Sequence, residues 1–244
     1  HSLDRRQRQM CIRDRSVMSL VSFIGPRPNI FDNRALGSVK RLEVKQPILT
    51  NEDMQKIRKI SEIGDNHFVS RVLDTTFDKN SGYKGFEQCL ENICLKSENV
   101  VKEGGNIIVL SDRQFGKGRI ALPALLAVAS VHHHLIRKGL RTAVGLVVES
   151  AEPREVHHFA VLAGYGAEAI NPYMAFDTIL DLKQKNMLSK DVSEIEAVSR
   201  YIKSVNKGLL KVMSKMGIST YQSYCGAQIF DAVGLSEEFV SKYF

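Results

Sequence analysis

Polar side chains follow several apolar runs of this sequence, at the points where strands are predicted to end. They are Asp74 with Thr75 and Thr76; Ser111, Asp112 and Arg113; Glu149 with Ser150; and Asn171. In α/β proteins, ligands bind outside the carboxyl ends of parallel strands. Two or three carboxylates and one guanidinium at that edge are groups suited to general acid–base catalysis.

The same residues have a structural interpretation, which we favour. Side chains at strand ends commonly cap the helices that follow, and an arginine among carboxylates forms an ion pair. No nucleophile and base stand at a spacing typical of a catalytic pair. We therefore predict that Arg113 bridges Asp74 and Glu149, and we assign no catalytic residue. The weak candidates for catalysis are Asp112, Arg113 and Glu149.

Two histidine clusters, residues 132–134 and 157–158, fall on predicted helices. Adjacent helical residues point about 100° apart, so neither cluster offers two ligands to one metal ion from a single face. We expect these histidines at helix surfaces or in hydrogen bonds between helices. Cys89 and Cys94 are five residues apart, which is not a zinc-binding spacing, and we interpret them as core cysteines.

The elements that must position these residues alternate between strand and helix. Strands are predicted over residues 69–78, 106–110, 142–150 and 169–173, with a last short strand over 218–220, and helices over residues 82–102, 123–137, 153–166, 174–185, 192–216 and 226–235. A further helix begins after Thr50 or Asn51, either of which can cap it.

This alternation predicts an α/β fold built from parallel βα units. About five units fit between residues 69 and 234, whereas a complete eight-unit barrel typically takes about 250 residues. The sequence therefore predicts a rudimentary or partial TIM-barrel-like domain, with an open doubly wound sheet as the other arrangement.

Composition places the chain among ordinary globular proteins, with 43% hydrophobic and 25% charged residues. No run approaches the roughly 18 apolar residues of a membrane span, and four cysteines fit a reducing compartment, so we expect a cytoplasmic protein. The net charge is +7, of which residues 1–15 contribute +3 through five arginines against two aspartates. The remaining charge is mixed in sign, and we expect no nucleic-acid or membrane partner.

We divide the chain into three parts. Residues 1–15 form a foreign-looking leader that has no apolar period, and we expect it to be disordered and dispensable. Residues 16–46 form an irregular segment broken by Gly25, Pro26 and Pro28. Residues 47–244 form the α/β domain.

Several strings of this sequence resemble the large subunit of glutamate synthase. They are PILTNEDMQKI from residue 47, NIIVLSDR from residue 106, the long string from Leu122 to Tyr173, and KGLLKVMSKMGISTYQSYCGAQIFDAVGL from residue 207. The resemblance runs from about residue 17 to residue 244 and matches the family's central domain. In the family, this domain joins the amidotransferase domain to the flavin-binding barrel and is a rudimentary form of that barrel.

The resemblance implies that the full enzyme is an oxidoreductase of amino-acid biosynthesis. It makes glutamate from glutamine and 2-oxoglutarate and passes ammonia internally to a flavin site, which serves nitrogen assimilation. FMN and a 3Fe-4S cluster belong to the full enzyme. Cys89, Cys94 and Cys225 do not match the family's cluster ligands, and Cys11 does not match its amidotransferase nucleophile. We therefore expect no cofactor and no metal on this chain, and no catalysis by it alone.

The implied role is that of a scaffold. Its partners are the amidotransferase and flavin-binding domains of the same polypeptide, and the full enzyme also uses a small NAD(P)H-oxidising subunit or ferredoxin. One alternative is a free-standing, small, barrel-like enzyme that uses Asp74, Asp112, Arg113 and Glu149. Another is a module that binds acidic partners through Lys207, Lys211 and Lys215, which lie four residues apart on one predicted helix.

Overall fold

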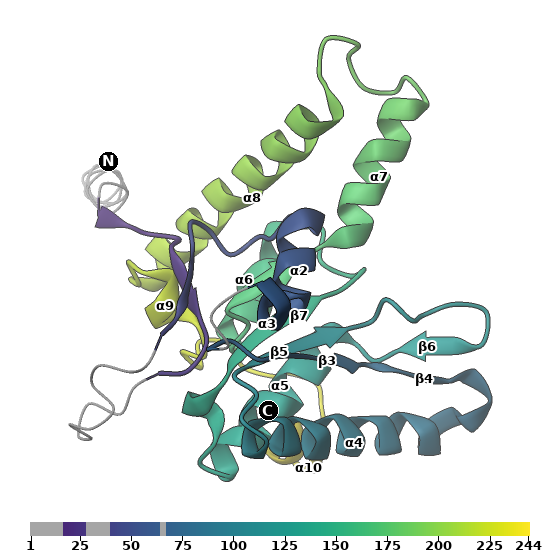
Figure 1. Ribbon diagram of the computed structural model, residues 1–244, viewed down its shortest axis with the longest axis vertical. Helices are drawn as coiled ribbons and strands as arrows, with labels where there is room; N and C mark the ends of the chain where they lie inside the picture. Colours follow the sequence, from purple (N-terminus) through teal and green to yellow (C-terminus); the bar gives the residue numbers. More distant parts are fainter. Residues whose placement is uncertain (1–16, 28–39, 64–66) are drawn as a thin grey trace.

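A computed structural model describes residues 17–27, 40–63 and 67–244 of the chain (Figure 1). The predicted leader lies outside the described residues. The predicted irregular segment is described in part and contains a short antiparallel pair of strands, β1 (Ser22–Ile24) and β2 (Leu42–Val44). Among the described residues, no helix is long and apolar enough to cross a membrane.

The central sheet has four parallel strands in the order β3-β5-β7-β8. These are β3 (Ser70–Asp74), β5 (Ile107–Ser111), β7 (Gly145–Glu149) and β8 (Ala169–Asn171). Within this sheet, the strands lie side by side in the order in which they occur in the chain, so the sheet winds in one direction. A doubly wound sheet reverses its strand order partway, and this sheet does not. The fold is therefore the partial barrel of the two predicted arrangements.

Three expectations about the strands need correction. The predicted strand over 69–78 is interrupted at Thr75: its second part, β4 (Thr76–Asp78), leaves the sheet and pairs with β6 (Arg119–Ala121). Residues 218–220 form only an isolated bridge, between Thr220 and Ser19, and do not join the central sheet. The sheet consequently contains four βα strands rather than about five.

An extended segment continues the sheet beyond β8. The amide of Leu49 donates to the carbonyl of Ile170 at 2.9 Å, and the amide of Ile170 donates to the carbonyl of Pro47 at 2.8 Å. This segment leads directly into α2 (Asn51–Arg58). Thr50 caps α2 as predicted, in a reciprocal arrangement with Asp53 that satisfies two free backbone amides.

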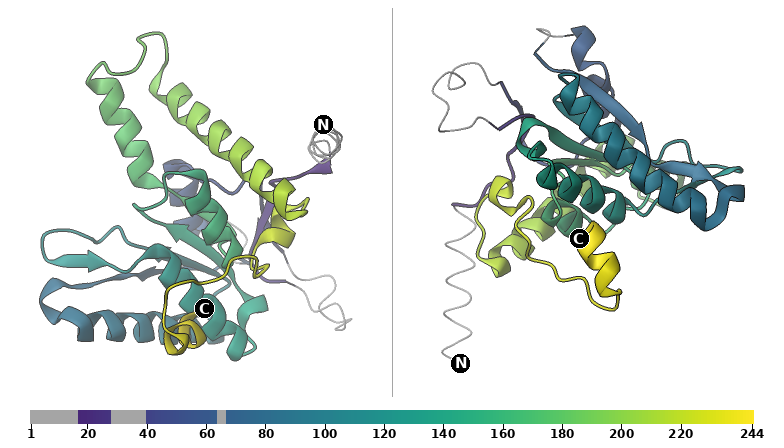
Figure 2. Two further views of the ribbon diagram at one scale, coloured as in Figure 1. Left: turned by 180° about the vertical axis from the view of Figure 1, so that it is seen from behind. Right: turned by 90° about the horizontal axis from the view of Figure 1, so that it is seen from below.

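Both faces of the sheet are covered, as a parallel sheet requires (Figures 1 and 2). Ile108, Leu110, Leu146, Val148 and Ile170 pack toward α4 (Gly82–Lys102), α5 (Ala124–Arg137), α6 (Val156–Gly164) and α8 (Glu194–Met216). The alternate residues Ile107, Val109, Val147 and Ala169 pack against Met54 and Ile57 of α2 and against Ile24 of β1. α2 and the N-terminal strands therefore fill the concave side that the missing strands of a full barrel would enclose.

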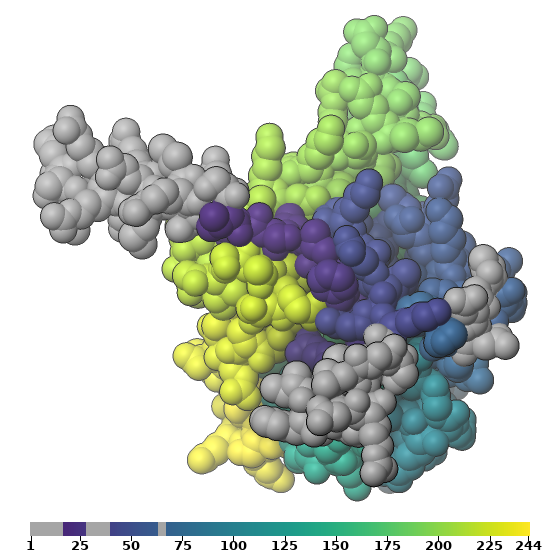
Figure 3. All heavy atoms as spheres, turned by 60° about the vertical axis from the view of Figure 1, so that its left-hand side comes forward, coloured from purple at the N-terminus to yellow at the C-terminus, as the bar shows by residue number. Residues whose placement is uncertain are grey.

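Helices α7 (Tyr173–Gln184) and α8 stand out from the body of the molecule, as Figure 3 shows in green. The buried residues of α8 are Ile202, Val205, Leu209 and Met213, and none lies in the first two turns of the helix. The bridge from Thr220 to Ser19 fixes the N-terminal segment beside the end of this helix (Figure 3).

The remaining elements are short. They are α3 (Ile60–Ile63), the 3₁₀ turns η1 (Lys79–Ser81) and η2 (Arg141–Ala143), α9 (Tyr221–Tyr224) and α10 (Glu237–Tyr243). The helix predicted over 226–235 is absent, because Gly226 and Gln228 both adopt positive φ angles, of 74° and 52°, which end helical geometry.

Helices α4 and α5 are tied by the carboxylate of Glu98. It accepts a hydrogen bond from Lys102 Nζ at 2.6 Å on its own helix and contacts His134 Nε2 at 3.0 Å on α5. Lys138 Nζ lies 3.7 Å away. These contacts, the lysine hydrogen bond foremost, lower the pKa of Glu98 to about 2.

Because the pKa of Glu98 is depressed on folding, the stabilisation is present above the unfolded-state pKa of about 4.3 and is lost as pH falls toward 2. We expect Glu98→Gln to lower the free energy of unfolding at pH 7. The difference from wild type should shrink progressively below about pH 5. Urea denaturation across this pH range measures it. Glu103→Gln, at an exposed residue just beyond the same helix, is the control; equal effects of the two substitutions would contradict the assignment.

Candidate functional site at the carboxyl ends of the strands

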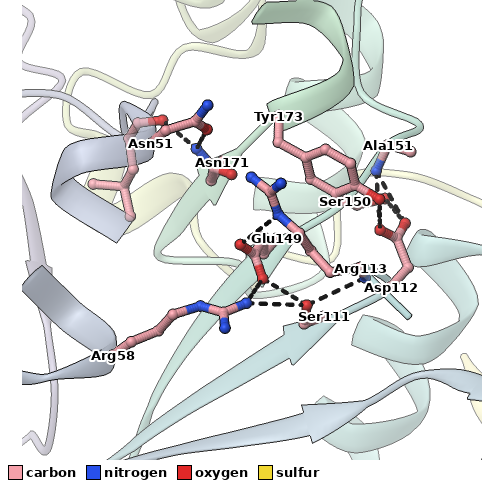
Figure 4. Close-up of polar contacts among 11 residues, drawn as sticks. Asn51, Arg58, Ser111, Asp112, Arg113, Glu149, Ser150, Ala151, Asn171 and Tyr173 are labelled. Carbon is pink, nitrogen blue, oxygen red and sulfur yellow. Dashed lines mark hydrogen bonds and ion pairs between the residues drawn. The ribbon is translucent and has the colours of Figure 1, made fainter. Parts of the chain in front are cut away.

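The sheet register places the predicted polar residues side by side. Asp74 lies opposite Ser111, Ser111 opposite Glu149, and Glu149 opposite Asn171. Asp112 and Arg113 follow directly after β5, and Tyr173 begins α7. Figure 4 shows these side chains, apart from Asp74, converging at one edge of the sheet.

Glu149 is the centre of this edge, and its side chain is only 1% exposed. One carboxylate oxygen accepts a hydrogen bond from Ser111 Oγ at 2.5 Å and forms an ion pair with Arg58. The other accepts from Arg113 Nε at 3.1 Å. A buried carboxylate is costly unless it is paired and hydrogen-bonded, and here three side chains meet that requirement.

Arg113 is held on a second side by an aromatic ring. Its guanidinium carbon lies 4.0 Å from the centroid of the Tyr173 ring, within the range of a cation–π contact. The Tyr173 hydroxyl donates to Asp112 Oδ1 at 2.6 Å. Burial, together with this bond to a carboxylate, raises the pKa of Tyr173, which therefore acts as a donor.

Asp112 is buried and accepts hydrogen bonds with both oxygens. Besides the Tyr173 hydroxyl, it accepts from Ser150 Oγ at 2.6 Å and from the Ala151 amide at 3.0 Å. These bonds hold the turn after β7 against the turn after β5. The geometry is that of a structural carboxylate, because its acceptor sites face partners of the same domain.

Asp74 departs from the prediction. It pairs with Arg119 of β6, at 2.7 Å from Arg119 Nη2, and accepts from the Thr76 amide and hydroxyl at 2.9 and 2.7 Å. The β4–β6 hairpin places Arg119 over Asp74 and so supplies the partner. The expected bridge of Arg113 between Asp74 and Glu149 is thus wrong in one half: the Arg113–Glu149 pair is present, and it is Glu149 that bridges two arginines.

Arg58 and Tyr173 were not identified as residues of this edge from the sequence, and the contacts of Asn171 were not predicted. Arg58 ends α2 and is 91 positions from Glu149, and no local pattern links the two residues. Asn171, which was named only as a polar strand end, is fully buried. Its amide donates to the Leu49 carbonyl at 3.0 Å and to Asn51 Oδ1 at 3.1 Å, which joins β8 to the start of α2.

A cleft of about 350 Å³ opens beside this network, between α2 and the ends of β3 and β5. Its lining residues are Gln55, Arg58, Val72, Asp74, Ser111, Arg113 and Gln114. Arg58 and Arg113 are 28% and 36% exposed, so their guanidinium groups reach the cleft while Glu149 behind them does not.

A second buried charge lies at the opposite, amino end of the strands. Glu168, just before β8, is fully buried, and burial raises its pKa. Its oxygens accept from the Gly25 amide at 3.2 Å and lie 3.6 Å from Arg141 and 3.7 Å from Arg27. Arg141 Nε also donates to His132, whose pKa falls to about 3 because the ring is buried.

The histidines and cysteines occupy structural positions. His132 is buried and His134 contacts Glu98 on the neighbouring helix, as the expectation of inter-helix hydrogen bonds required. Cys89 is buried in the main core and Cys94 is packed against it, which fits their interpretation as core cysteines. Among the described residues, no three His, Cys, Asp or Glu side chains are placed to hold a metal ion.

Together, the single-direction sheet and the closed polar network at its edge define a partial-barrel α/β domain. The sequence model of the family described as the glutamate synthase central domain matches residues 11–236. The chain belongs to this family.

Relatives with complete sequences are much longer. The chain is 41% identical over 233 residues to glutamate synthase [NADH] of Schizosaccharomyces pombe, which covers 96% of this chain and 11% of that protein. The large chain of glutamate synthase [NADPH] of Bacillus subtilis is also 41% identical, with 96% and 15% covered. Ferredoxin-dependent glutamate synthase of Pyropia yezoensis is 39% identical over 247 residues, again with 96% and 15% covered.

Among solved structures, a flavocytochrome b2 variant with sulfite bound is similar to this chain at a TM-score of 0.43 and 10% identity. The match covers 82% of this chain and 60% of the other.

Replacement of Arg113 tests the Glu149 network. Arg113→Ala removes one of two cationic partners from a buried carboxylate, and we expect a loss of about 2 kcal/mol in the free energy of unfolding. Arg113→Lys keeps the charge but loses the planar geometry and should cost about half as much. Arg200→Ala, which breaks an exposed pair on α8, should stay within about 0.5 kcal/mol. Urea denaturation compares the variants, and coincident curves for all of them would rule the network out as a stabilising element.

Proposed function

We propose that this chain is the linking domain of a glutamate synthase large subunit, a scaffold that holds the amidotransferase and flavin-binding domains in register. The observation that carries the proposal is the match itself: 96% of the chain aligns with relatives named as glutamate synthases, yet it spans only 11 to 15% of their length. The reaction is then the work of other segments of the polypeptide, and this segment contributes position and rigidity.

The polar edge supports a structural role over a catalytic one. Asp112 and Glu149 are buried, and their oxygens accept hydrogen bonds from side chains and amides of the same domain. A general acid or base must reach a substrate proton within hydrogen-bond distance. The carboxylates that the free-standing-enzyme alternative requires are engaged in holding the turns together. Asp74 is likewise paired, with Arg119.

Rigidity has a chemical use in this family of reactions. Ammonia released at one site is protonated and lost when it meets bulk water, so a connection that excludes water raises its effective concentration at the second site. A parallel sheet covered on both faces and clamped at both ends is suited to enclosing part of such a route. We propose that the domain forms one wall of it.

The cofactors of the full enzyme, FMN and a 3Fe-4S cluster in this proposal, do not fit the described residues. Cys89 and Cys94 lie on α4 and Cys225 follows α9, and no ligand group converges among the described residues. The proposal therefore places both groups in other segments of the full enzyme.

The electron donor is determined elsewhere in this proposal. The relatives that this chain matches at 39 to 41% identity include proteins named for NADH, NADPH and ferredoxin. A domain that stays similar across three donors does not select among them. The selecting residues, and the contacts with a small NAD(P)H-oxidising subunit or ferredoxin, then lie outside this domain, in a cytoplasmic enzyme.

The purified 244-residue chain should be colourless and should not form glutamate from glutamine and 2-oxoglutarate, because the proposal places the flavin site in another domain and no group of three His, Cys, Asp or Glu among the described residues is placed to hold a metal ion. An absorption spectrum after gel filtration in the presence of added FMN measures this. Stoichiometric flavin absorbance that survives the column would contradict it.

In the full-length enzyme, loosening the domain should uncouple the two reactions. We expect Arg113→Ala to raise the ratio of glutamine hydrolysed to glutamate formed above that of wild type, because ammonia escapes from a poorly aligned connection. Arg200→Ala is the matched control, since it removes an arginine from an exposed pair remote from the strand ends. An unchanged ratio in a variant that is measurably destabilised would argue against the scaffold role.

A further inference from the structure

Two arginines and one aspartate line the cleft at the strand ends. Arg58 and Arg113 both contact Glu149, and one carboxylate neutralises only one guanidinium. Asp74 also lines the cleft, but Arg119 balances its charge and Thr76 donates two hydrogen bonds to it. The charged residues that line this cleft are therefore two arginines and one aspartate, and Glu149, Arg119 and the buried Asp112 lie behind them.

The two arginines still have donors to offer. Arg113 uses Nε for Glu149 and stacks on Tyr173, a contact that consumes no N–H group. The bonds printed in Figure 4 leave its two terminal nitrogens directed away from Glu149. Arg58 contacts Ser111 and Glu149 through a single terminal nitrogen. Paired N–H groups of a fixed guanidinium match the two oxygens of a carboxylate or a phosphate.

We propose that this cleft binds a small oxyanion, namely the carboxylate or phosphate group of a compact metabolite. The geometry of the cleft sets the class of ligand. Its volume of about 350 Å³ suits a molecule of few atoms, and Val72, 43% exposed, offers one apolar wall. Gln55 and Gln114 line the remaining sides and supply amide donors.

The site is preorganised, which favours binding of a weakly held anion. Tyr173 fixes the plane of Arg113, and Glu149 fixes the position of both guanidinium groups before any ligand arrives. The two long side chains are thus already ordered in the folded protein, so binding does not carry the entropic cost of immobilising them. The proposal is independent of the scaffold role, because it concerns only these side chains and the cleft between them.

Calorimetric titration of the 244-residue chain with inorganic phosphate, and separately with succinate, tests the proposal. Chloride at matched ionic strength is the reference for non-specific screening. We expect saturable binding of at least one of the two anions. Phosphate binding alone would identify a phosphate site, and succinate binding alone a carboxylate site.

Substitutions then locate the site. Arg113→Gln and Arg58→Gln should each weaken the bound anion by at least about tenfold, and Arg200→Gln should leave it unchanged. Arg113→Lys should fall between wild type and Arg113→Gln, because it keeps the charge without the paired donors. Each titration is run below the unfolding midpoint of that variant, established by circular dichroism.

One further variant keeps the test decisive if the arginine variants fail to fold. Val72→Phe narrows the cleft from an exposed strand position without touching the charged network, and it should abolish binding while the protein stays folded. The proposal is overturned if neither anion binds saturably, or if Val72→Phe or a folded Arg113→Gln variant binds the anion as wild type does.

Discussion

The buried carboxylate of Glu149 is the interaction on which the architecture of the strand ends depends. A carboxylate that is 1% exposed is costly without partners, and the partners of Glu149 come from two separate parts of the chain. Arg58 brings the end of α2, Ser111 brings β5, and Arg113 brings the turn after β5, with Tyr173 of α7 stacked upon it. One ionised group thus fixes the relative positions of elements that the apolar core alone would leave free to slide.

The amino ends of the strands are clamped by the same principle. Glu168 is fully buried beside β8, and the Gly25 amide and Arg141 approach its oxygens. The fit is close: a Cβ atom on Gly145 would lie 2.4 Å from the Gly25 nitrogen and 2.7 Å from Glu168 Oε2. Glycine is required there because the N-terminal segment passes directly over the start of β7. Buried charges at both ends of the sheet, with α2 on its concave face, make the partial barrel a closed and rigid unit.

The filled inner face and the internally paired strand ends explain how this domain can serve as a rigid link. In a full barrel, the inner face of each strand packs against the other strands, and the strand ends are left to loops that bind substrate. Here α2 occupies the inner face, and the carboxylates at the strand ends serve the domain itself, through Asp112 and Glu149. What stays open is the small cleft that Arg58, Asp74 and Arg113 line. The domain therefore has the framework of a ligand-binding fold, but most polar side chains at the strand ends form contacts that hold its own elements together.

The sequence by itself determined the features that depend on neighbouring residues. The buried strands at 107–111 and 145–149, the start of α2 after Thr50 or Asn51 and the long amphipathic α4 follow from apolar runs, capping residues and helical periodicity. Family membership followed from long strings of agreement. Only the tertiary structure decided which charges meet, because Arg58 and Glu149 are 91 positions apart and Arg119 and Asp74 are 45 apart. It also decided that the predicted strand over 69–78 divides at Thr75, since β4 leaves the sheet to pair with β6. Ion pairs and strand partners are chosen by distance in space after folding, and no local pattern of residue types encodes that distance.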